Sequence, residues 1–339
     1  MFADALSITF IFNENILSFV GYMGLLATLA FINPYIVNGY CRAAIIGWQL
    51  AGSCYQNQLF YEKVRWSLMV AIEPKVFLEW FDHMSDYSIQ PFLEINPRLV
   101  LKPARVYMSS RWKMAQKVKV LLDTYQIIQH HCLLKNLMLQ SGESKLVHTT
   151  LGKQCDVTVT LNHDVRFRKE GELVLDLWVG SLTRAVSSVA FSLERNMDGS
   201  YTCYIGCIQG GKDGHQHDDV IIATKAMHGI RPKSLLIFVV QEIGRSIGVS
   251  KLYGVGNAIQ AHRNKHWIRV PFFHDYPFNY DETWIEAKGV AESNGWYRLP
   301  LETHKRSIEE IKTNKRSMYS RRYKMMDDIS HQIISVLTP

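Results

Sequence analysis

The stretch "AMHGIRPKSLLIFVVQEIGRSIGVSKLYGVGN", residues 226–257, combines the signals of a turn, a long apolar helix and a short buried strand. Pro232 stands where the helix should begin, and this position suits proline because an N–H group there would have no partner within the helix. The apolar run that follows is long enough for about four helical turns. We therefore predict a helix over residues 232–247 and a strand over residues 251–256.

The loop in front of this helix carries an unusual concentration of polar and basic residues. Free amides at a helix start attract an anion by about 0.3 to 1 kcal/mol, and Arg231 and Lys233 would add charge-assisted hydrogen bonds. A phosphate or pyrophosphate is the natural occupant of such a site. An alternative stays open, in which Arg231 and Lys233 only cap the helix or pair with acidic neighbours. The predicted donor-binding residues are His228, Gly229, Ile230, Arg231, Lys233 and Ser234.

The spacing of apolar residues divides the rest of the chain into a helical part and a part made of strands. Residues 43–140 show helical spacing, most clearly over 111–140, and from about residue 146 the period changes to that of strands. We predict a mostly antiparallel meander of strands over residues 156–161, 171–179, 184–194 and 200–210. A polar loop is predicted over 210–219, a helix followed by a strand over 279–301, and a basic amphipathic helix over 305–336.

These patterns predict an α+β fold in three regions. An apolar helical segment (1–60) and a helical region (61–145) precede a mixed, mostly antiparallel sheet with flanking helices and a basic carboxy-terminal helix (146–339). Residues 16–32 form a helix of about 25 Å, slightly shorter than a bilayer core of about 30 Å. A membrane span, a packed helix and a membrane-surface helix remain open. Because the first basic residues follow this segment, we expect the chain to be cytoplasmic, with association with the inner membrane as an open alternative.

Composition narrows the classes of partner. The chain has 38 Lys and Arg against 31 Asp and Glu, for a net charge of +7, which favours anionic partners. Nucleic acid is the least favoured of these, because no recognition motif is present. The six cysteines contain no C-x-x-C pair, and Cys203 and Cys207 would lie about 13 Å apart in a strand, too far for a disulfide.

The sequence contains neither a complete set of metal ligands at a suitable spacing nor a known hydrolase motif. His215 and His217 form an H-x-H pattern, but they lie in a glycine-rich loop and no third ligand follows at a suitable spacing. We therefore predict no metal. Neither a G-x-S-x-G elbow, an H-E-x-x-H motif nor a Walker loop occurs.

The order of elements around the opening stretch resembles the core of the N-acetyltransferase superfamily. In those enzymes the pyrophosphate of acyl-coenzyme A lies at the corresponding helix start, and the acyl group lies where the two flanking strands part. The resemblance therefore implies an acetyltransferase-like carboxy-terminal domain. The chain departs from the superfamily because "HGIRPKS" replaces its glycine-rich loop, which leaves the acyl donor open.

A closer resemblance covers roughly residues 95–325. The succession "RFRKEGELVL", "HGIRPKSLL", "GVGNAIQAH", "NYDETWIEAKG", "GWYRLPL" and "KRSMYSRRY" is similar to the VirK/YbjX family of Gram-negative bacteria. That family is associated with virulence, with tolerance of cationic antimicrobial peptides and with envelope remodelling. One departure is Gly256, which stands where the family usually has serine.

Three residues are candidates for catalysis. Neutral histidine near its ordinary pKa of about 6.5 suits a general base, so His262 is the first choice, with Asn257 beside it at the end of a strand. Glu170 is the second candidate base. Their structural alternatives are a surface histidine beside Arg263 and a carboxylate paired with Arg168 or Lys169.

The sequence thus leads to two hypotheses of function. The first is an acyltransferase without a permanently bound cofactor, which uses acyl-coenzyme A or an acyl carrier protein as co-substrate. It would modify an amine or hydroxyl on an envelope lipid or peptide. The second is a non-catalytic, membrane-associated protein that binds anionic lipid or a partner protein.

Overall fold

The computed structural model describes residues 73–83, 89–139, 144–151, 155–180, 182–210, 216–261 and 278–337, with Ser67 and Val70. The predicted apolar segment, including the helix over 16–32, lies outside these residues. Contacts divide the chain into two compact units, Met1–Asp82 and His83–Pro339. In the first unit, helix α4 (Pro74–Asp82) buries Phe77 and Trp80 completely. No described helix has the length and apolar character needed to cross a bilayer.

The second unit is built on one open sheet of eight strands, in the order β1-β2-β3-β4-β5-β6-β8-β7. All neighbours are antiparallel except β5 and β6, which are parallel. The predicted α+β class and the mostly antiparallel meander are therefore confirmed. The strands are β1 (Lys145–Leu151), β2 (Cys155–Asn162), β3 (Leu173–Val179), β4 (Ser187–Arg195), β5 (Tyr201–Gly210), β6 (Val249–Val255), β7 (Val290–Ala291) and β8 (Trp296–Leu299).

Helices lie before, between and after these strands. The predicted helix over 111–140 is two helices, because the chain leaves helical geometry at His131. The helix predicted over 232–247 is confirmed at both ends, and it stops at Gly248, whose φ of 87° is left-handed. The helices of this unit are α5 (Gln90–Ile95), η3 (Pro97–Ala104), α6 (Met114–His130), α7 (Cys132–Leu139), η4 (Val165–Phe167), α8 (Gln216–Ala226), α9 (Pro232–Ile247), α10 (Tyr280–Glu286), η5 (Thr313–Lys315) and α11 (Arg316–Leu337).

Several predicted boundaries differ from the structure, and two of the differences concern a helix start. Part of the loop predicted over 210–219 is helical, because α8 already begins at Gln216, with Asp218 and Asp219 in its first turn, where the helix dipole favours them. The basic helix predicted from residue 305 begins only at Arg316, and most of the preceding residues are exposed.

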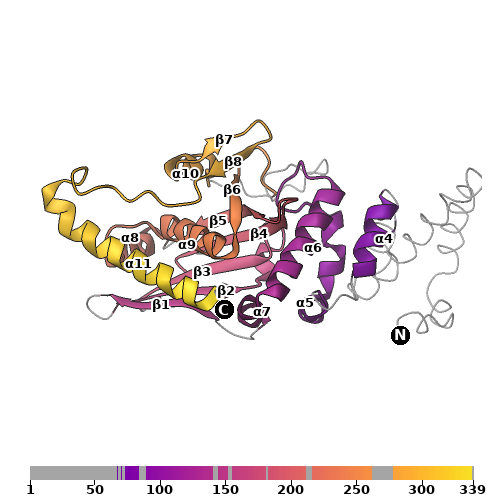
Figure 1. Ribbon diagram of the computed structural model, residues 1–339, viewed down its shortest axis with the longest axis horizontal. Coiled ribbons are helices and arrows are strands. Elements are labelled where there is room, and N and C mark those ends of the chain that lie inside the picture. The colour runs from indigo at the N-terminus through magenta and orange to yellow at the C-terminus, as the bar shows by residue number, and fades with distance from the viewer. Residues whose placement is uncertain are drawn as a thin grey trace, which may run out of the picture. The chain divides into compact units, whose positions relative to one another are not determined.

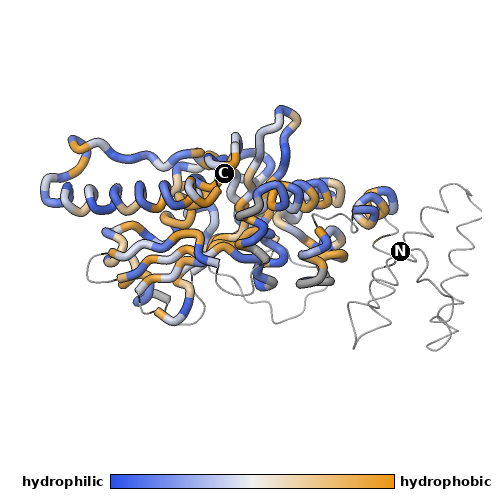
Figure 2. The backbone as a smooth tube through the Cα atoms, turned by 60° about the horizontal axis from the view of Figure 1, so that its bottom comes forward, coloured by the Kyte–Doolittle hydropathy of each residue, from blue (hydrophilic) through white to orange (hydrophobic). Residues whose placement is uncertain are grey.

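Helices cover both faces of the central strands, which agrees with the burial of these strands. Every residue of β3 and β4 up to Leu193 is buried except Trp178, as expected for central strands covered on both faces. Helices α6 and α9 both pack against β4, while α11 lies beside α9 and β1 (Figure 1). Figure 2 shows apolar segments concentrated in the strands and a mixed pattern along α11. The buried residues of α11 are Met325, Met326, Ile329, Ile333 and Leu337.

Candidate functional site

The parallel ladder between β5 and β6 ends before β5 does. Pairing ends at Ile205 and Gly254, but β5 continues beside β4 as far as Gly210. A bulge in the β4–β5 ladder accompanies this change, because Ala190 pairs with Cys207 whereas Phe191 pairs with Ile205. Strand β6 itself ends at Val255, and we call the place beside β5 beyond this end the opening.

Tyr280, the first residue of α10, bridges this opening. Its backbone N–H donates to the Oδ1 of Asn257, just after β6, at 2.9 Å, and its hydroxyl donates to the Sγ of Cys207 on β5 at 3.4 Å. The side chain of Tyr280 is buried. Tyr280 thus links the residue after β6 to the end of β5.

This contact passes through the plane of the sheet. A Cβ atom added at Gly254 would lie only 2.5 Å from the ring of Trp284, so this face of Gly254 is turned toward α10. Successive residues of a strand face opposite sides, so Tyr253 faces away from α10. Cys207 faces the side of Tyr253, because the bulge sets it on the same face as Tyr204, the partner of Tyr253. Tyr280 therefore reaches across from one face of the sheet toward the other.

Cys207 and Glu170 lie together on the far side of the opening. Burial raises the pKa of the Cys207 thiol strongly, and the charge of Glu170 raises this pKa further. Glu170 is 4% exposed. Gly206 permits this approach, since a Cβ atom there would lie 2.1 Å from the carbonyl oxygen of Glu170. Cys207 is thus a protonated thiol, unsuited to act as a thiolate nucleophile at neutral pH.

The loop "HGIRP" forms a left-handed turn before α9. His228 and Gly229 have φ values of 54° and 78°. The guanidinium of Arg322 on α11 donates to the carbonyl oxygen of His228 from Nε at 3.1 Å and from Nη2 at 3.0 Å. Ile230 is buried, which anchors the loop to the core. Part of this motif is therefore explained by backbone geometry.

The start of α9 carries positive charge around the opening. No side chain caps the helix, and its first intrahelical bond is from Leu235 N–H to the carbonyl of Arg231, so the N–H groups of Lys233 and Ser234 precede it. The Nζ of Lys233 lies 3.7 Å from the ring centroid of Phe278. Burial lowers the pKa of Lys233, while the neighbouring groups of Cys207 and Glu286 act to raise this pKa.

Arg231 and Ser234 lie further out. Arg231 forms a salt bridge with Glu286 at 2.7 Å, and both side chains are more than half exposed. Exposed ion pairs of this kind contribute about 0 to 1 kcal/mol, so this contact holds Arg231 only weakly. Ser234 is exposed. Among the described residues, Lys233 is therefore the cation that acts on Cys207, and Arg231 is an outer one.

The structure brings together only part of the predicted catalytic set. Glu170 lies beside the opening, and Asn257 lies at its edge, where its backbone N–H and its side-chain amide donate to Asp281 and Asn279 at 2.8 and 2.6 Å. These bonds make Asn257 a link between β6 and α10. His262 lies outside the described residues. Cys207 and Tyr280 were not predicted, because no local pattern indicates their contact.

A separate buried network lies between η3, α6 and β3. Lys102 forms an ion pair with Glu172, and the hydroxyl of Tyr125 donates to the same carboxylate. His163 completes the group, with Nδ1 at 3.0 Å from the carbonyl oxygen of Glu172. Burial opposes ionisation of Glu172, yet Lys102 and His163 hold its pKa below the ordinary value. This charge pair is enclosed in the core.

The described part of the chain contains no candidate metal site. No group of three or more His, Cys, Asp or Glu side chains there is placed to hold a metal ion. His215 lies outside the described residues, and His217 falls in the first turn of α8.

Comparison with known proteins identifies the family. The model of a family described as "Protein of unknown function (DUF535)" matches residues 56–335. The uncharacterized protein YbjX of Escherichia coli (strain K12) is 26% identical over 312 residues, which cover 89% of this chain and 88% of YbjX. An uncharacterized protein of Haemophilus influenzae is 33% identical over 146 residues, 41% of this chain and 48% of that protein.

A second uncharacterized protein of H. influenzae is 30% identical over 178 residues, 52% of this chain and 56% of that protein. No solved structure matches the chain. The family match spans most of the sequence, so the resemblance that the motifs predicted is confirmed. The chain belongs to the DUF535 family, the VirK/YbjX family of its sequence motifs.

Proposed function

We propose that the protein is an acyltransferase that takes the acyl group from a phosphopantetheine-type thioester and transfers it to an amine or hydroxyl. The observation that carries this proposal is the opening beyond the end of β6, which lies beside the positively charged start of α9. An acetyltransferase-like arrangement uses such an opening for the acyl chain and such a helix start for the phosphates. The phosphates would meet the amides of α9 and the ammonium of Lys233.

The chemistry assigned to the opening requires a base and an acid. The acceptor nitrogen or oxygen attacks the thioester carbonyl, so that a C–N or C–O bond forms and the C–S bond breaks. Glu170 takes the proton that the acceptor loses, and the hydroxyl of Tyr280 gives its proton to the departing thiolate. Exchange with water then restores both groups. Cys207 accepts a hydrogen bond from Tyr280 and so orients the hydroxyl at rest.

Donor binding by the full-length protein tests this proposal. Isothermal titration calorimetry with coenzyme A, acetyl- and long-chain acyl-coenzyme A and acyl carrier protein should give saturable binding of at least one donor. Lys233→Gln should weaken it by roughly 10- to 100-fold, since it removes one charge-assisted hydrogen bond. Arg231→Gln should weaken it less, because Arg231 lies outward in an exposed ion pair.

Lys225→Gln is the matched control, because Lys225 is an exposed lysine on the neighbouring helix α8. It should leave donor affinity unchanged. Failure of every donor to bind, or equal affinities for the native protein and Lys233→Gln, would reject the proposal.

A second function is favoured by the basic surface at the start of α11. Residues 311–326 contain no acidic residue, and Lys312, Lys315, Arg316, Arg321 and Lys324 are exposed. Each basic residue near an anionic membrane surface contributes about 1 kcal/mol. This surface supports the non-catalytic alternative, in which the protein binds anionic lipid at the inner membrane. Cosedimentation with anionic but not zwitterionic vesicles, in the absence of any donor binding, would favour this second function.

A further inference from the structure

A cleft of about 560 Å³ opens on the face of the sheet that carries Tyr204 and Tyr253. These two tyrosines are paired one position before the end of the parallel ladder. The cleft therefore lies next to the opening, on the side that α10 does not cover. Its walls come from the start of α6, from β4 to β6 and from the segment that leads into β8. Its size falls in the range of small-molecule sites.

Aromatic rings form the apolar wall of this cleft. Trp112 meets Tyr204 edge to face with centroids 5.0 Å apart, and it lies 5.4 Å from Trp296. Tyr204 and Tyr253 stack at 5.7 Å. Trp296 is buried, whereas Trp112, Tyr204 and Tyr253 are partly exposed. The rings support one another and leave flat faces for a ligand ring.

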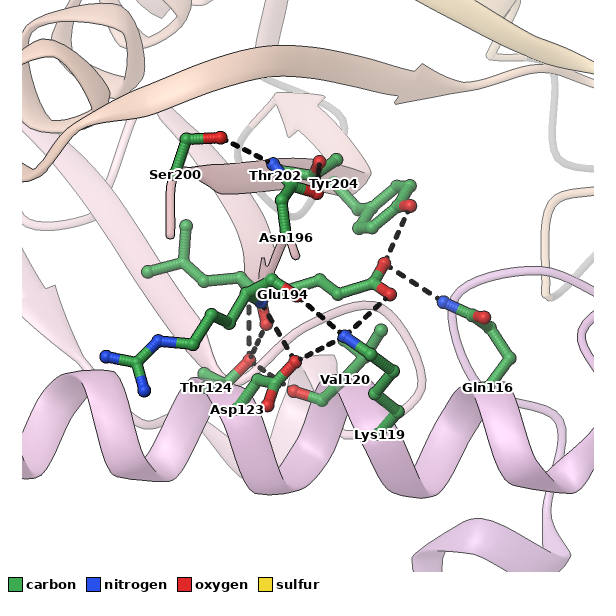
Figure 3. Close-up of polar contacts among 12 residues, drawn as sticks. Gln116, Lys119, Val120, Asp123, Thr124, Glu194, Asn196, Ser200, Thr202 and Tyr204 are labelled. Carbon is green, nitrogen blue, oxygen red and sulfur yellow. Dashed lines mark hydrogen bonds and ion pairs between the residues drawn. The ribbon is translucent and has the colours of Figure 1, made fainter. Parts of the chain in front are cut away.

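Glu194 of β4 contributes a carboxylate to the lining of the cleft, and Figure 3 shows the polar contacts that hold it. Its Oε2 accepts hydrogen bonds from the Tyr204 hydroxyl at 2.9 Å and from the Nε2 of Gln116 at 3.0 Å, and Lys119 lies 3.0 Å from Oε1. Burial raises the pKa of Tyr204, and Glu194 raises it further, so this hydroxyl stays a donor. The carboxylate keeps capacity to accept a hydrogen bond from a ligand hydroxyl.

The rim of the cleft is positively charged. Arg111 and Lys113 are exposed, and neither forms an ion pair with any described residue. Helix α6 starts here without an acidic residue in its first turn, and its dipole adds to their charge. Since Lys119 also offsets the charge of Glu194, the cleft suits an anion and disfavours a free cation.

We propose that this cleft binds a phosphorylated sugar. The sugar ring packs on Trp112 and Tyr253, a ring hydroxyl donates to Glu194, and the phosphate meets Arg111 and Lys113. The ring faces, the hydrogen-bonding carboxylate and the two cations that form no ion pair with a described residue each match one part of such a ligand. In the proposed acyl transfer this ligand is the acceptor, but the binding site stands on the cleft alone.

Calorimetric titration of the full-length protein with glucose 6-phosphate and adenosine monophosphate tests the proposal. Glucose, adenosine and inorganic phosphate serve as fragments. We expect at least one phosphorylated probe to bind tenfold or more tightly than either of its fragments, and added salt should weaken its binding. Preference for the first probe indicates a glycan source, and preference for the second indicates a nucleotide source. If neither probe exceeds its fragments, the proposal is wrong.

Variants separate the site from a general charge effect. The double variant Arg111→Gln/Lys113→Gln should lose at least tenfold in affinity, and both positions are exposed, so folding should be retained. Tyr253→Phe should keep the affinity, whereas Tyr253→Leu should lose it. Lys251→Gln is the matched control, because Lys251 is exposed on the same strand but does not line the cleft. An unaffected double variant, or an equal loss in Lys251→Gln, would overturn the proposal.

Discussion

The hydroxyl of Tyr280 donates to the buried Sγ of Cys207 across the opening beyond the end of β6, at 3.4 Å. The two residues are 73 positions apart in the chain. Their contact places a phenolic proton donor beside a thiol whose pKa is raised by burial. The donor role therefore belongs to the tyrosine, and the cysteine is a neutral partner.

Variants of these two residues should behave differently in the proposed transfer. Tyr280→Phe removes the proton donor and should lower the transfer rate by roughly 10²- to 10⁴-fold while donor affinity stays near that of the native protein. Cys207→Ala should lower the rate by less than about fivefold, because a protonated thiol is not the nucleophile. Mass spectrometry of acylated product gives the rates. An inactive Cys207→Ala variant that folds and binds donor would show that the thiol takes part in chemistry.

The buried pair of Lys102 and Glu172 should give a strong coupling in a double-mutant cycle. Lys102→Met or Glu172→Gln alone leaves one charge buried without its partner and should cost about 3 to 5 kcal/mol in the free energy of unfolding. The double variant should cost less than the sum of the two by more than about 1 kcal/mol.

Urea denaturation measures these free energies. The exposed pair of Lys305 and Asp327 is the control, with side chains 41% and 55% exposed, and its cycle should give a coupling of no more than about 1 kcal/mol. Additive costs at Lys102 and Glu172 would mean that each charge is stabilised by other groups.

Sequence patterns predicted the elements whose signals are local. Helix α9 was predicted to the residue because Pro232 marks its start and the apolar run lasts its full length. Helix α8 was missed because Val220, Ile221 and Ile222 are consecutive and give no helical period, and the two isoleucines are in fact exposed. Strand β1 was missed because only two adjacent residues of it, Leu146 and Val147, are buried.

The candidate site was predictable only where its residues lie close in sequence. The loop before α9 could be recognised from basic residues around Pro232. The partner of Glu172 is Lys102, 70 residues away, so the sequence "RFRKEGELVL" drew attention to Glu170 and not to Glu172. Likewise, the position of Tyr280 depends on where the β5–β6 ladder ends, which no local pattern specifies.

Acid should destabilise the protein through His163. Burial lowers the pKa of His163 below the ordinary value of 6.5, although Glu172 acts to raise it. The unfolded chain therefore binds a proton that the folded chain does not, and stability falls as the pH drops below 6.5 toward the folded pKa. The slope is at most about 1.4 kcal/mol per pH unit for this one group.

His163→Gln should flatten this dependence, measured as the free energy of unfolding in urea at pH 7.5 and 5.5. His228→Gln is the comparison, because burial, followed by the charges of Arg321 and Arg322, also lowers the pKa of His228, but at a half-buried site. It should flatten the slope less. An unchanged slope in His163→Gln would place the acid sensitivity in other groups.

The left-handed turn at His228 and Gly229 should tolerate substitution at only one of its two positions. Gly229→Ala puts a Cβ atom 2.8 Å from the Nη2 of Arg322 at a φ of 78°, so it adds a close contact to backbone strain and should cost about 2 to 4 kcal/mol in stability. His228→Gly relieves a φ of 54° and keeps the carbonyl that Arg322 binds, so it should change stability by less than about 1 kcal/mol. Thermal unfolding of both variants measures the difference.

Gly199→Ala controls for strain alone, since its φ is 84° and no atom lies within 4 Å of an added Cβ. Because the turn positions the start of α9, Gly229→Ala should also weaken donor binding, whereas Gly199→Ala should not. If both variants change stability and donor binding equally, the contact with α11 does not set the geometry of the loop.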